Sequence, residues 1–438
     1  MKSNNANNIS NLGNNNNQFN LSQKNIYNDK INNNISNINK NGTINGQLMI
    51  DNESIFSTDK EKELDKTFNF KARDIPLLSN EKAGCGSNYI NTFCIFKTSD
   101  GKTVLVYSTK NCIENIIRIY YLNLDAVKFE KIFIYDNFDE KDNSNAIKEN
   151  RRIPTQCRHF KLEQEDYLII CFKDSYLYLY KYEKNIFNQI KDFSIGGKPI
   201  IGVCLFKNRV NNEINIITIQ MESSLMKITD LDGNNKDIKM ENNIYFLDIF
   251  QKNNKNYLIV GFLNEVGSFE LEYYPQNMRY YKNKEKKNNS GKGHECIIIY
   301  KSKENEKNIK LIDSDTEGKV INIFNFESAL LLLILDLKYC KPLGLDFFNK
   351  NYIIISCFED ERKDSIKIIN INLEKENYKR NYIDLERNNY SEEEAKIVCC
   401  LNGHEKGVLS CLKMENKLYG EFLVSIGMDN KLKLWVND

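Results

Sequence analysis

The chain has 438 residues, of which 61 are basic and 60 acidic, so its formal net charge is only +1. Because charges of both signs are interleaved, no large field of one sign can attract nucleic acid or anionic lipid. The first residues lack an apolar stretch, and the longest apolar run, residues 329–335, stops at Asp336. We therefore expect no nucleic-acid partner, no signal peptide and no membrane insertion.

Residues 1–62 are predicted to form a disordered, Asn-rich tail of low complexity. Nineteen of the first fifty residues are Asn, and aromatic or β-branched residues are too sparse there to offset the entropy lost on ordering the backbone. A solvated appendage is the preferred interpretation, with a self-associating Asn-rich segment as the alternative.

Residues 63–438 contain a repeated unit. Each repeat has a first short run closed by a bulky apolar residue before a polar turn, and these anchors recur at intervals of 44 to 64 residues: Phe96, Phe160, Phe206, Phe250, Tyr300, Phe348 and Leu412. The shorter intervals are near the roughly 40 to 45 residues of a four-stranded propeller blade. The two longest intervals contain polar insertions, around residues 136–152 and 373–394.

Three further runs follow the anchors. Second runs, almost continuously apolar and typical of strands covered on both faces, are residues 103–108, 167–172, 214–220, 257–262, 309–314, 352–358 and 422–427. Third, alternating runs are residues 115–122, 176–182, 225–231, 267–274, 319–326, 365–372 and 431–436. Weaker fourth runs fit residues 127–136, 187–195, 235–240, 278–283, 330–338 and 395–401.

The apolar residues recur every two positions, in segments too short for helices. The pattern predicts an all-β fold, a seven-bladed β-propeller of four-stranded antiparallel blades, with six or eight blades as alternatives. Only six fourth strands are found, which would leave the outer edge of the last blade unpaired. Within residues 63–78, the segment 67–78 has strand character, and we expect it to supply that outer strand and close the ring.

The last repeat carries a more specific pattern. Gly403 and His404 precede it, and residues 425–435 read Ser-Ile-Gly-Met-Asp-Asn-Lys-Leu-Lys-Leu-Trp. This pattern resembles a WD repeat, with its Gly-His start, small-residue strand, Asp turn and terminal Trp at matching spacing. Through residues 419–421, Tyr-Gly-Glu, the wider segment is similar to divergent WD-repeat proteins of protists.

The resemblance implies a structural hydrogen-bond chain that runs from Trp435 through Ser425 and His404 to Asp429. Such a set is physically reasonable, because its buried donors and acceptors can satisfy one another. Parts of the pattern stand in two other repeats, at Asp174, Tyr180, His294, Ser314 and Phe324.

The motifs of catalysis and metal binding are not found. Of the three His, His294 and His404 fall at repeat starts, while His159 lacks the further ligands that a metal site with Cys157 would need. No GxSxG, HExxH or phosphate loop is present. We therefore expect no enzyme activity, no catalytic residue, no cofactor and no metal, although a nucleophile and a base could still meet from distant loops.

The twelve Cys form no CxxC pair and mostly lie in apolar runs. They are expected to be small core residues in a reducing compartment, which favours a cytoplasmic protein. The basic run at residues 282–287 leaves the nucleus as an alternative, although a charged loop is the preferred interpretation. The pair Arg151 and Arg152 lacks the glycine that follows in phosphoinositide-binding propellers, so a solvated loop is expected there too.

The predicted fold favours a protein-interaction scaffold, a subunit of a larger complex, that binds partner proteins through its loops. The alternatives are a propeller enzyme with its site at the central channel and a phosphoinositide-binding propeller. One aromatic stretch is a candidate partner contact, although ordinary packing is preferred for part of it: Tyr273, Tyr274, Arg279, Tyr280 and Tyr281.

Overall fold

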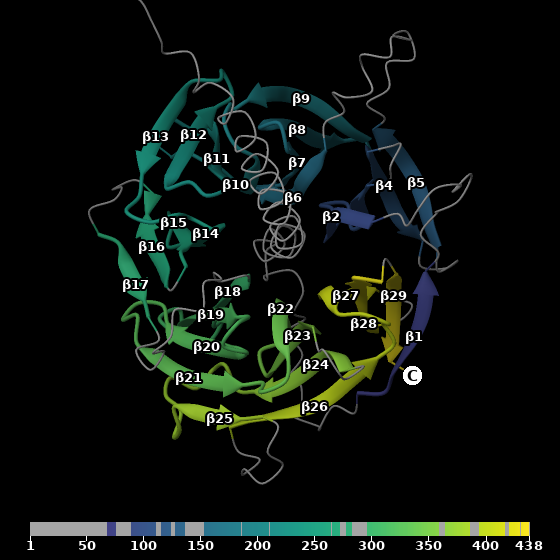
Figure 1. The fold of residues 1–438 in the computed structure, drawn as a ribbon, viewed down its shortest axis with the longest axis vertical. Coiled ribbons are helices and arrows are strands. Elements are labelled where there is room, and N and C mark those ends of the chain that lie inside the picture. The colour runs from purple at the N-terminus through teal and green to yellow at the C-terminus, as the bar shows by residue number, and fades with distance from the viewer. Residues whose placement is uncertain are drawn as a thin grey trace, which may run out of the picture.

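The computed structural model shows a ring built from strands and loops (Figure 1). The residues that it describes are 68–75, 89–110, 115–123, 128–135, 153–184, 186–209, 211–263, 265–271, 277–282, 296–358, 364–385, 394–416, 420–429 and 431–437. Among these residues there is no α-helix, and none of their segments is a helix able to cross a membrane. The predicted tail, residues 1–62, lies outside them.

The described strands form seven sheets. The first contains β2 (Tyr89–Lys97), β3 (Thr103–Lys110), β4 (Asn115–Asn123) and β5 (Lys128–Tyr135). The second contains β6 (Pro154–Leu162), β7 (Glu165–Phe172), β8 (Tyr176–Glu183) and β9 (Ile186–Ser194). The third contains β10 (Ile200–Lys207), β11 (Ile214–Gln220), β12 (Leu225–Asp230) and β13 (Asn235–Lys239). The fourth contains β14 (Phe246–Lys252), β15 (Lys255–Gly261), β16 (Val266–Glu270) and β17 (Arg279–Tyr281).

The remaining sheets depart from strict chain order. The fifth contains β18 (Cys296–Lys301), β19 (Ile309–Asp315), β20 (Val320–Asn325), β21 (Leu331–Asp336) and an added strand, β25 (Tyr382–Asp384). The sixth contains β22 (Lys341–Asn349), β23 (Tyr352–Phe358), β24 (Asp364–Ile371) and β26 (Ala395–Asn402). The seventh contains β27 (Val408–Asn416), β28 (Gly420–Gly427), β29 (Leu432–Asn437) and β1 (Phe70–Ile75).

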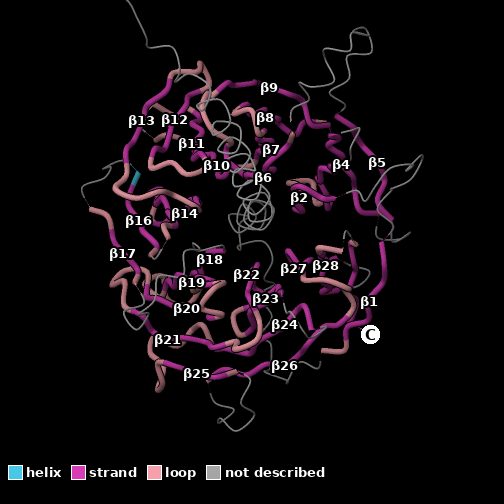
Figure 2. The backbone as a smooth tube through the Cα atoms, viewed as in Figure 1, coloured by secondary structure: helices cyan, strands magenta, loops and turns pink. Residues whose placement is uncertain are grey.

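The sheets follow one another around the ring, as the tube in Figure 2 also shows. The first strand of each sheet lies toward the centre and the last strand lies at the periphery (Figure 1). Apart from the added strand β25, neighbouring strands within a sheet run antiparallel, so the loop before each first strand and the loop joining the second and third strands lie on the same face. The other loops lie on the opposite face.

The second strands are the most deeply buried elements, because neighbouring sheets cover both of their faces. Every residue of β19 is buried, as are all but the first of β7 and all but the last of β23. Their side chains join large apolar clusters that extend across several sheets. Each fully buried aliphatic or aromatic side chain contributes about 1.5 to 3 kcal/mol, so packing between the sheets dominates the stability of the ring.

Strand β1 lies within the segment that was expected to close the ring, and it forms the outer edge of the seventh sheet. It pairs antiparallel with β29, with Ala72 opposite Trp435. The backbone N–H of Asn69 donates to Asn437 Oδ1 at 2.8 Å. Phe68 then packs edge-on against Phe348, with ring centroids 5.2 Å apart. The seventh sheet thus combines an early segment of the chain with a late one.

The fifth sheet is extended by a segment that leaves the sixth sheet after β24. Strand β25 pairs parallel with β21, with Leu335 opposite Ile383, before the chain returns to the sixth sheet as β26. The described part of this excursion, residues 372–385, buries Leu373 completely, as well as most of Tyr378 and Ile383. The polar insertion expected around residues 373–394 thus contributes a short strand and several buried side chains to the fifth sheet.

Candidate functional site

The hydrogen-bond chain implied for the last repeat is formed in the structure. The indole Nε1–H of Trp435 donates to Ser425 Oγ at 2.7 Å, and Ser425 Oγ lies 2.7 Å from His404 Nε2. His404 Nδ1 is 3.0 Å from Asp429 Oδ1. All four groups are satisfied when the hydroxyl donates to Nε2 and the Nδ1–H donates to the carboxylate.

Asp429 anchors this chain to the loops of one face. Its carboxylate accepts from the backbone N–H of Glu405 at 2.9 Å and of Lys431 at 3.1 Å. Burial alone would raise the pKa of Asp429, but the hydrogen bonds from His404 and from the backbone hold it below its ordinary value. Gly427 is required beside it, because a Cβ there would come within 2.3 Å of both the imidazole and the carboxylate.

Ser425, His404 and Asp429 stand in the order of a Ser-His-Asp catalytic triad, which needs an accessible nucleophile. Ser425 is only 1% exposed and its Oγ already accepts from Trp435. His404 and Trp435 are also buried. The arrangement therefore holds two loops and two strands together rather than presenting a nucleophile to a substrate.

His159 is a core residue. It is fully buried, its Nε2 lies 2.9 Å from Asp166 Oδ1, and its ring stacks on Phe96 with centroids 3.9 Å apart. Burial lowers the pKa of His159 more than Asp166 raises it. Among the described residues no group of three or more His, Cys, Asp or Glu could hold a metal ion.

A buried ion pair near the centre was missed by the sequence analysis. Arg158 on β6 reaches across the third sheet to the fourth, where its Nη2 donates to Asp248 Oδ1 at 2.9 Å. Its Nη1 donates to the backbone carbonyls of Val203 and Leu247, both at 2.8 Å. Three central strands, β6, β10 and β14, are thus tied by one guanidinium group.

Two carboxyl groups occupy equivalent places in this central layer. Asp248 and Asp346 each stand two residues before an aromatic anchor, as Arg158 does, and that shared position is the signal that could have revealed the layer. Burial raises the pKa of Asp248 to about 6 despite the adjacent Arg158. Burial also raises the pKa of Asp346 to about 7, although its Oδ2 accepts from the backbone N–H of Lys413 at 2.9 Å.

The predicted contact residues fall into three groups. Tyr273 and Tyr274 lie outside the described residues. Arg279 pairs with Glu327 at 3.1 Å, and Tyr280 remains 40% exposed on the rim of the fourth sheet. The ammonium of Lys282 lies 5.3 Å from the ring centroid of Tyr280.

Tyr281 requires a correction, because it is only 1% exposed and cannot contact a partner. Its hydroxyl lies 2.9 Å from Ser268 Oγ and donates to the carbonyl of Phe326 at 2.7 Å. The alternation along β17 that exposes Tyr280 turns Tyr281 into the core between the fourth and fifth sheets. In the fifth repeat, His294 lies outside the described residues, while Ser314 bonds to the backbone of Cys296.

Comparison with solved structures identifies the architecture. The chain is similar to a chain in the crystal structure of the mitotic checkpoint complex, with a TM-score of 0.52, 12% identity and coverage of 87% of this chain and 97% of that one. It is similar to Saccharomyces cerevisiae Sqt1, with a TM-score of 0.52, 11% identity and coverage of 79% and 84%. A third similar structure, BBS1N in complex with ARL6DN, has a TM-score of 0.51, 10% identity and coverage of 85% and 98%.

The fold is that of a β-propeller. Each sheet is a blade, and the blades present their loops on the two faces of the propeller. No family model and no curated protein sequence matches the chain, so the likeness concerns the fold. Within this propeller the hydrogen-bond chain from Trp435 to Asp429 ties together strands and loops of the seventh blade. Arg158 links the second, third and fourth blades.

Proposed function

We propose that residues 63–438 form a seven-bladed propeller of the WD-repeat type, preceded by a tail of residues 1–62, and that it is a non-catalytic scaffold for partner proteins. We place it in the cytoplasm, with the nucleus as the alternative, as a subunit of a larger complex. The observation that supports this function is the contrast between strands and loops. The strands are committed to packing between blades, whereas the loops of both faces remain free to contact partners.

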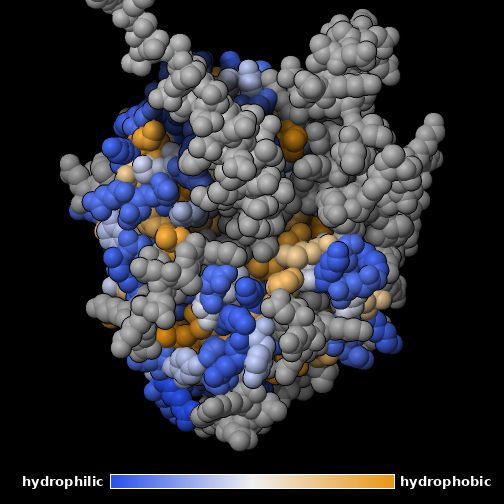
Figure 3. All heavy atoms as spheres, viewed as in Figure 1, coloured by the Kyte–Doolittle hydropathy of each residue, from blue (hydrophilic) through white to orange (hydrophobic). Residues whose placement is uncertain are grey.

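The exposed side chains suit such a role. Hydrophilic residues predominate on the described surface in the view of Figure 3, and the exposed large apolar side chains include Tyr280, Leu330 and Tyr339. Protein interfaces commonly depend on a few aromatic or Arg side chains in a polar surround. Two of the similar structures are of assemblies, the mitotic checkpoint complex and a complex of BBS1N with ARL6DN.

Tyr280 is the described residue that we assign to a partner contact, with Arg279 beside it. Purification of the tagged chain from native cells should recover at least one partner protein. Tyr280→Ala should lower recovery of that partner at least about tenfold, the effect of removing an interface hot spot, because its ring is exposed and fixed by Lys282. The melting temperature should change by no more than a few degrees.

Tyr339→Ala is the matched control, since Tyr339 is an exposed tyrosine, 59% accessible, in the loop between the fifth and sixth blades. If partner recovery were lost only in this control, the contact would belong to that loop and the assignment to Tyr280 would be wrong. Recovery of no partner by the wild-type chain would count against the scaffold function itself.

A catalytic centre is the second candidate, and the carboxyl groups of Asp248 and Asp346 are the observation that favours it. Raised pKa values are common among catalytic acids. Both groups are already engaged, however, Asp248 with Arg158 and Asp346 with the backbone of Lys413. A hydrolytic activity present in the wild-type chain and lost in Asp346→Asn would favour this alternative over the scaffold.

A further inference from the structure

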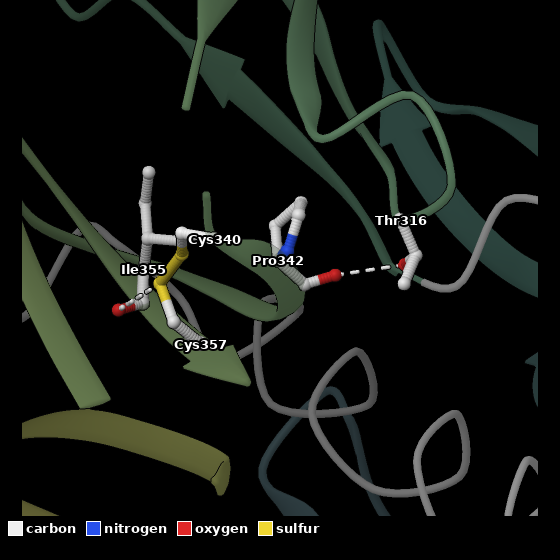
Figure 4. Close-up of a disulfide and its surroundings, with 5 residues drawn as sticks. All are labelled: Thr316, Cys340, Pro342, Ile355 and Cys357. Carbon is white, nitrogen blue, oxygen red and sulfur yellow. Dashed lines mark hydrogen bonds between the residues drawn. A yellow bond between two sulfur atoms is a disulfide. The ribbon is translucent and has the colours of Figure 1, made fainter. Parts of the chain in front are cut away.

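Two cysteines of the sixth blade form a disulfide bond, Cys340 to Cys357 (Figure 4). Their Cα atoms are 5.8 Å apart, within the usual range for such bonds. Eight other described cysteines are free thiols, six of them buried. The expectation of unpaired core cysteines is therefore wrong for this pair.

We propose that Cys340 and Cys357 form a reversible thiol–disulfide site that clamps one loop of the propeller. In the oxidised form the bond holds the turn of residues 337–341 against the end of β23. In the reduced form the turn is released from that strand. The site requires no partner protein and is independent of the scaffold function.

The surroundings of the bond accommodate both forms. Both residues are fully buried within an apolar cluster that includes Leu337, Leu345 and Ile355. Cys357 Sγ lies 3.9 Å from the carbonyl oxygen of Ile355, so a thiol at this position has an acceptor within the range of a weak sulfur hydrogen bond. Reduction therefore leaves the Cys357 thiol with a hydrogen-bond acceptor inside the core.

The clamped turn lies on the same face as the loops of the neighbouring blades. Thr316 of the fifth blade donates its hydroxyl hydrogen bond to the carbonyl of Pro342 at 2.8 Å, just after Cys340 (Figure 4). On the other side Phe358 follows Cys357 and packs so closely on Gly407 that a Cβ there would come within 2.6 Å of its ring. Gly407 in turn accepts from the backbone N–H of Met428 at 2.8 Å.

These contacts give the bond an influence beyond its own hairpin. They connect it to the turn after β19 in the fifth blade and to the His404 loop in the seventh. The turn itself exposes Tyr339 to solvent. Release of the clamp is thus expected to loosen one sector of a single face, from the fifth blade to the seventh, and to leave the opposite sector unchanged.

The chemistry is ordinary thiol–disulfide exchange with a low-molecular-weight disulfide as the oxidant. One protein thiolate attacks that disulfide, forms a mixed disulfide and expels one small thiol. The second protein thiolate then displaces the second small thiol and completes the Cys340–Cys357 bond, so two electrons and two protons pass to the oxidant. A dithiol reverses both steps, and burial of both sulfurs means that exchange requires local opening of the turn.

Mass spectrometry of the native full chain tests the bond directly. After incubation with oxidised glutathione and blocking of free thiols, digestion with trypsin, which does not cleave the Lys341–Pro342 bond, should yield the peptide of residues 339–350 linked to that of residues 351–362. After incubation with dithiothreitol, both peptides should appear separately with blocked thiols. Two separate peptides under both conditions would overturn the proposal.

Thermal unfolding and limited proteolysis test the clamp. Dithiothreitol should lower the melting temperature of the wild-type chain by on the order of 5 °C, since the bond closes a short loop in the unfolded chain. It should also accelerate tryptic cleavage at Lys338 several-fold. The double variant Cys340→Ser with Cys357→Ser should show neither response, and Cys411→Ala, a buried free thiol in the seventh blade, should retain both.

Equal responses of the wild-type chain and the double variant to dithiothreitol would also overturn the clamp. The peptide analysis uses the wild-type chain, so it remains decisive if the double variant fails to fold. Reduction that separates the peptides without accelerating cleavage at Lys338 would contradict release of the turn.

Discussion

Trp435 ends a chain of buried polar groups in which each member satisfies the next. Trp435→Ala should lower the free energy of unfolding by about 3 to 5 kcal/mol, the range for deletion of a large buried aromatic side chain. Trp435→Phe should cost less, about 1 to 2 kcal/mol, because it keeps most of the apolar contact but leaves Ser425 Oγ without its donor. Urea titrations followed by circular dichroism measure both values.

The same residue offers a direct check of burial, because it is the single Trp of the chain. The native protein should show the blue-shifted fluorescence of an apolar environment, which moves to longer wavelength on unfolding. A native emission maximum equal to that of the unfolded chain would contradict the hydrogen-bond chain.

Asp346 should make stability depend on pH. Its pKa of about 7 in the folded state exceeds the roughly 3.9 of an unperturbed Asp, so between these values the folded chain binds the proton more tightly than the unfolded chain. Stability contributed by this group is therefore present in acid and is lost as the pH rises from about 4 to 7.

Asp346→Asn should remove this dependence, because the amide is uncharged at every pH and can still accept from the backbone of Lys413. The variant should be more stable than the wild type by roughly 1 to 3 kcal/mol at pH 8 and equally stable near pH 4. Asp237→Asn, on the exposed strand β13, is the matched control and should change neither value. If the wild type were more stable than Asp346→Asn at pH 8, the charged carboxylate would be stabilising and the prediction would be wrong.

At the scale of elements, β1 is the strand on which the seventh blade depends for its outer edge. Deletion of residues 67–78 removes every hydrogen bond between β1 and β29 and the packing of Phe68 on the sixth blade. We expect aggregation or a loss of melting temperature of at least about 10 °C, equivalent to several kcal/mol. Deletion of residues 1–46, the control, should leave the melting temperature within about 2 °C.

The segment that supplies β25 is held by a partly buried carboxylate. Glu374 accepts hydrogen bonds from Tyr300, from Ser302 at 2.5 Å and from Asn308 at 2.9 Å through its backbone carbonyl. Nearby, burial lowers the pKa of Lys310 to about 8, and its ammonium donates to the carbonyl of Leu373 at 2.6 Å. Side chains of the fifth blade therefore hold the part of the segment that precedes β25 in the chain.

Glu374→Ala should cost about 2 to 4 kcal/mol, because two hydroxyl donors lose their acceptor in a partly buried site. Hydrogen exchange should rise at the amides of Ile334 and Leu385, which bond to Asn381 and Asp336 across the added strand pair. Glu376→Ala, in the same segment, should have a smaller effect on stability. If hydrogen exchange at Ile334 were unchanged in Glu374→Ala, the Glu374 carboxylate would not be what holds β25 in place.

Periodicity identifies most of the strands, because side chains on the two faces of each strand meet different surroundings. The second runs coincide with β3, β7, β11, β15, β19, β23 and β28, all packed between blades. Strand β25 could not be found in this way. It has three residues and pairs with β21, where its partners lie 48 positions earlier in the chain, as Ile334 does opposite Tyr382, so no local pattern marks it.

For the whole molecule, the all-β fold was predictable because a blade repeats and its repeats can be aligned. The His404 network was expected from a resemblance confined to one repeat, and its four residues meet in the structure. The pair of Arg158 and Asp248 joins repeats two and four. Its geometry depends on the curvature of the ring, which strand patterns in single repeats do not reveal.

The pairing of β1 with β29 has a consequence for synthesis of the protein. A ribosome releases β1 long before β29 exists, since the residues joined by the Asn69–Asn437 bond are 368 positions apart. The other blades can assemble from neighbouring segments as they emerge, whereas β1 must wait with an unpaired edge until the seventh blade has been translated. Such long-range pairing slows folding and exposes the nascent chain to aggregation, so the burden on chaperones should fall mainly on this last step.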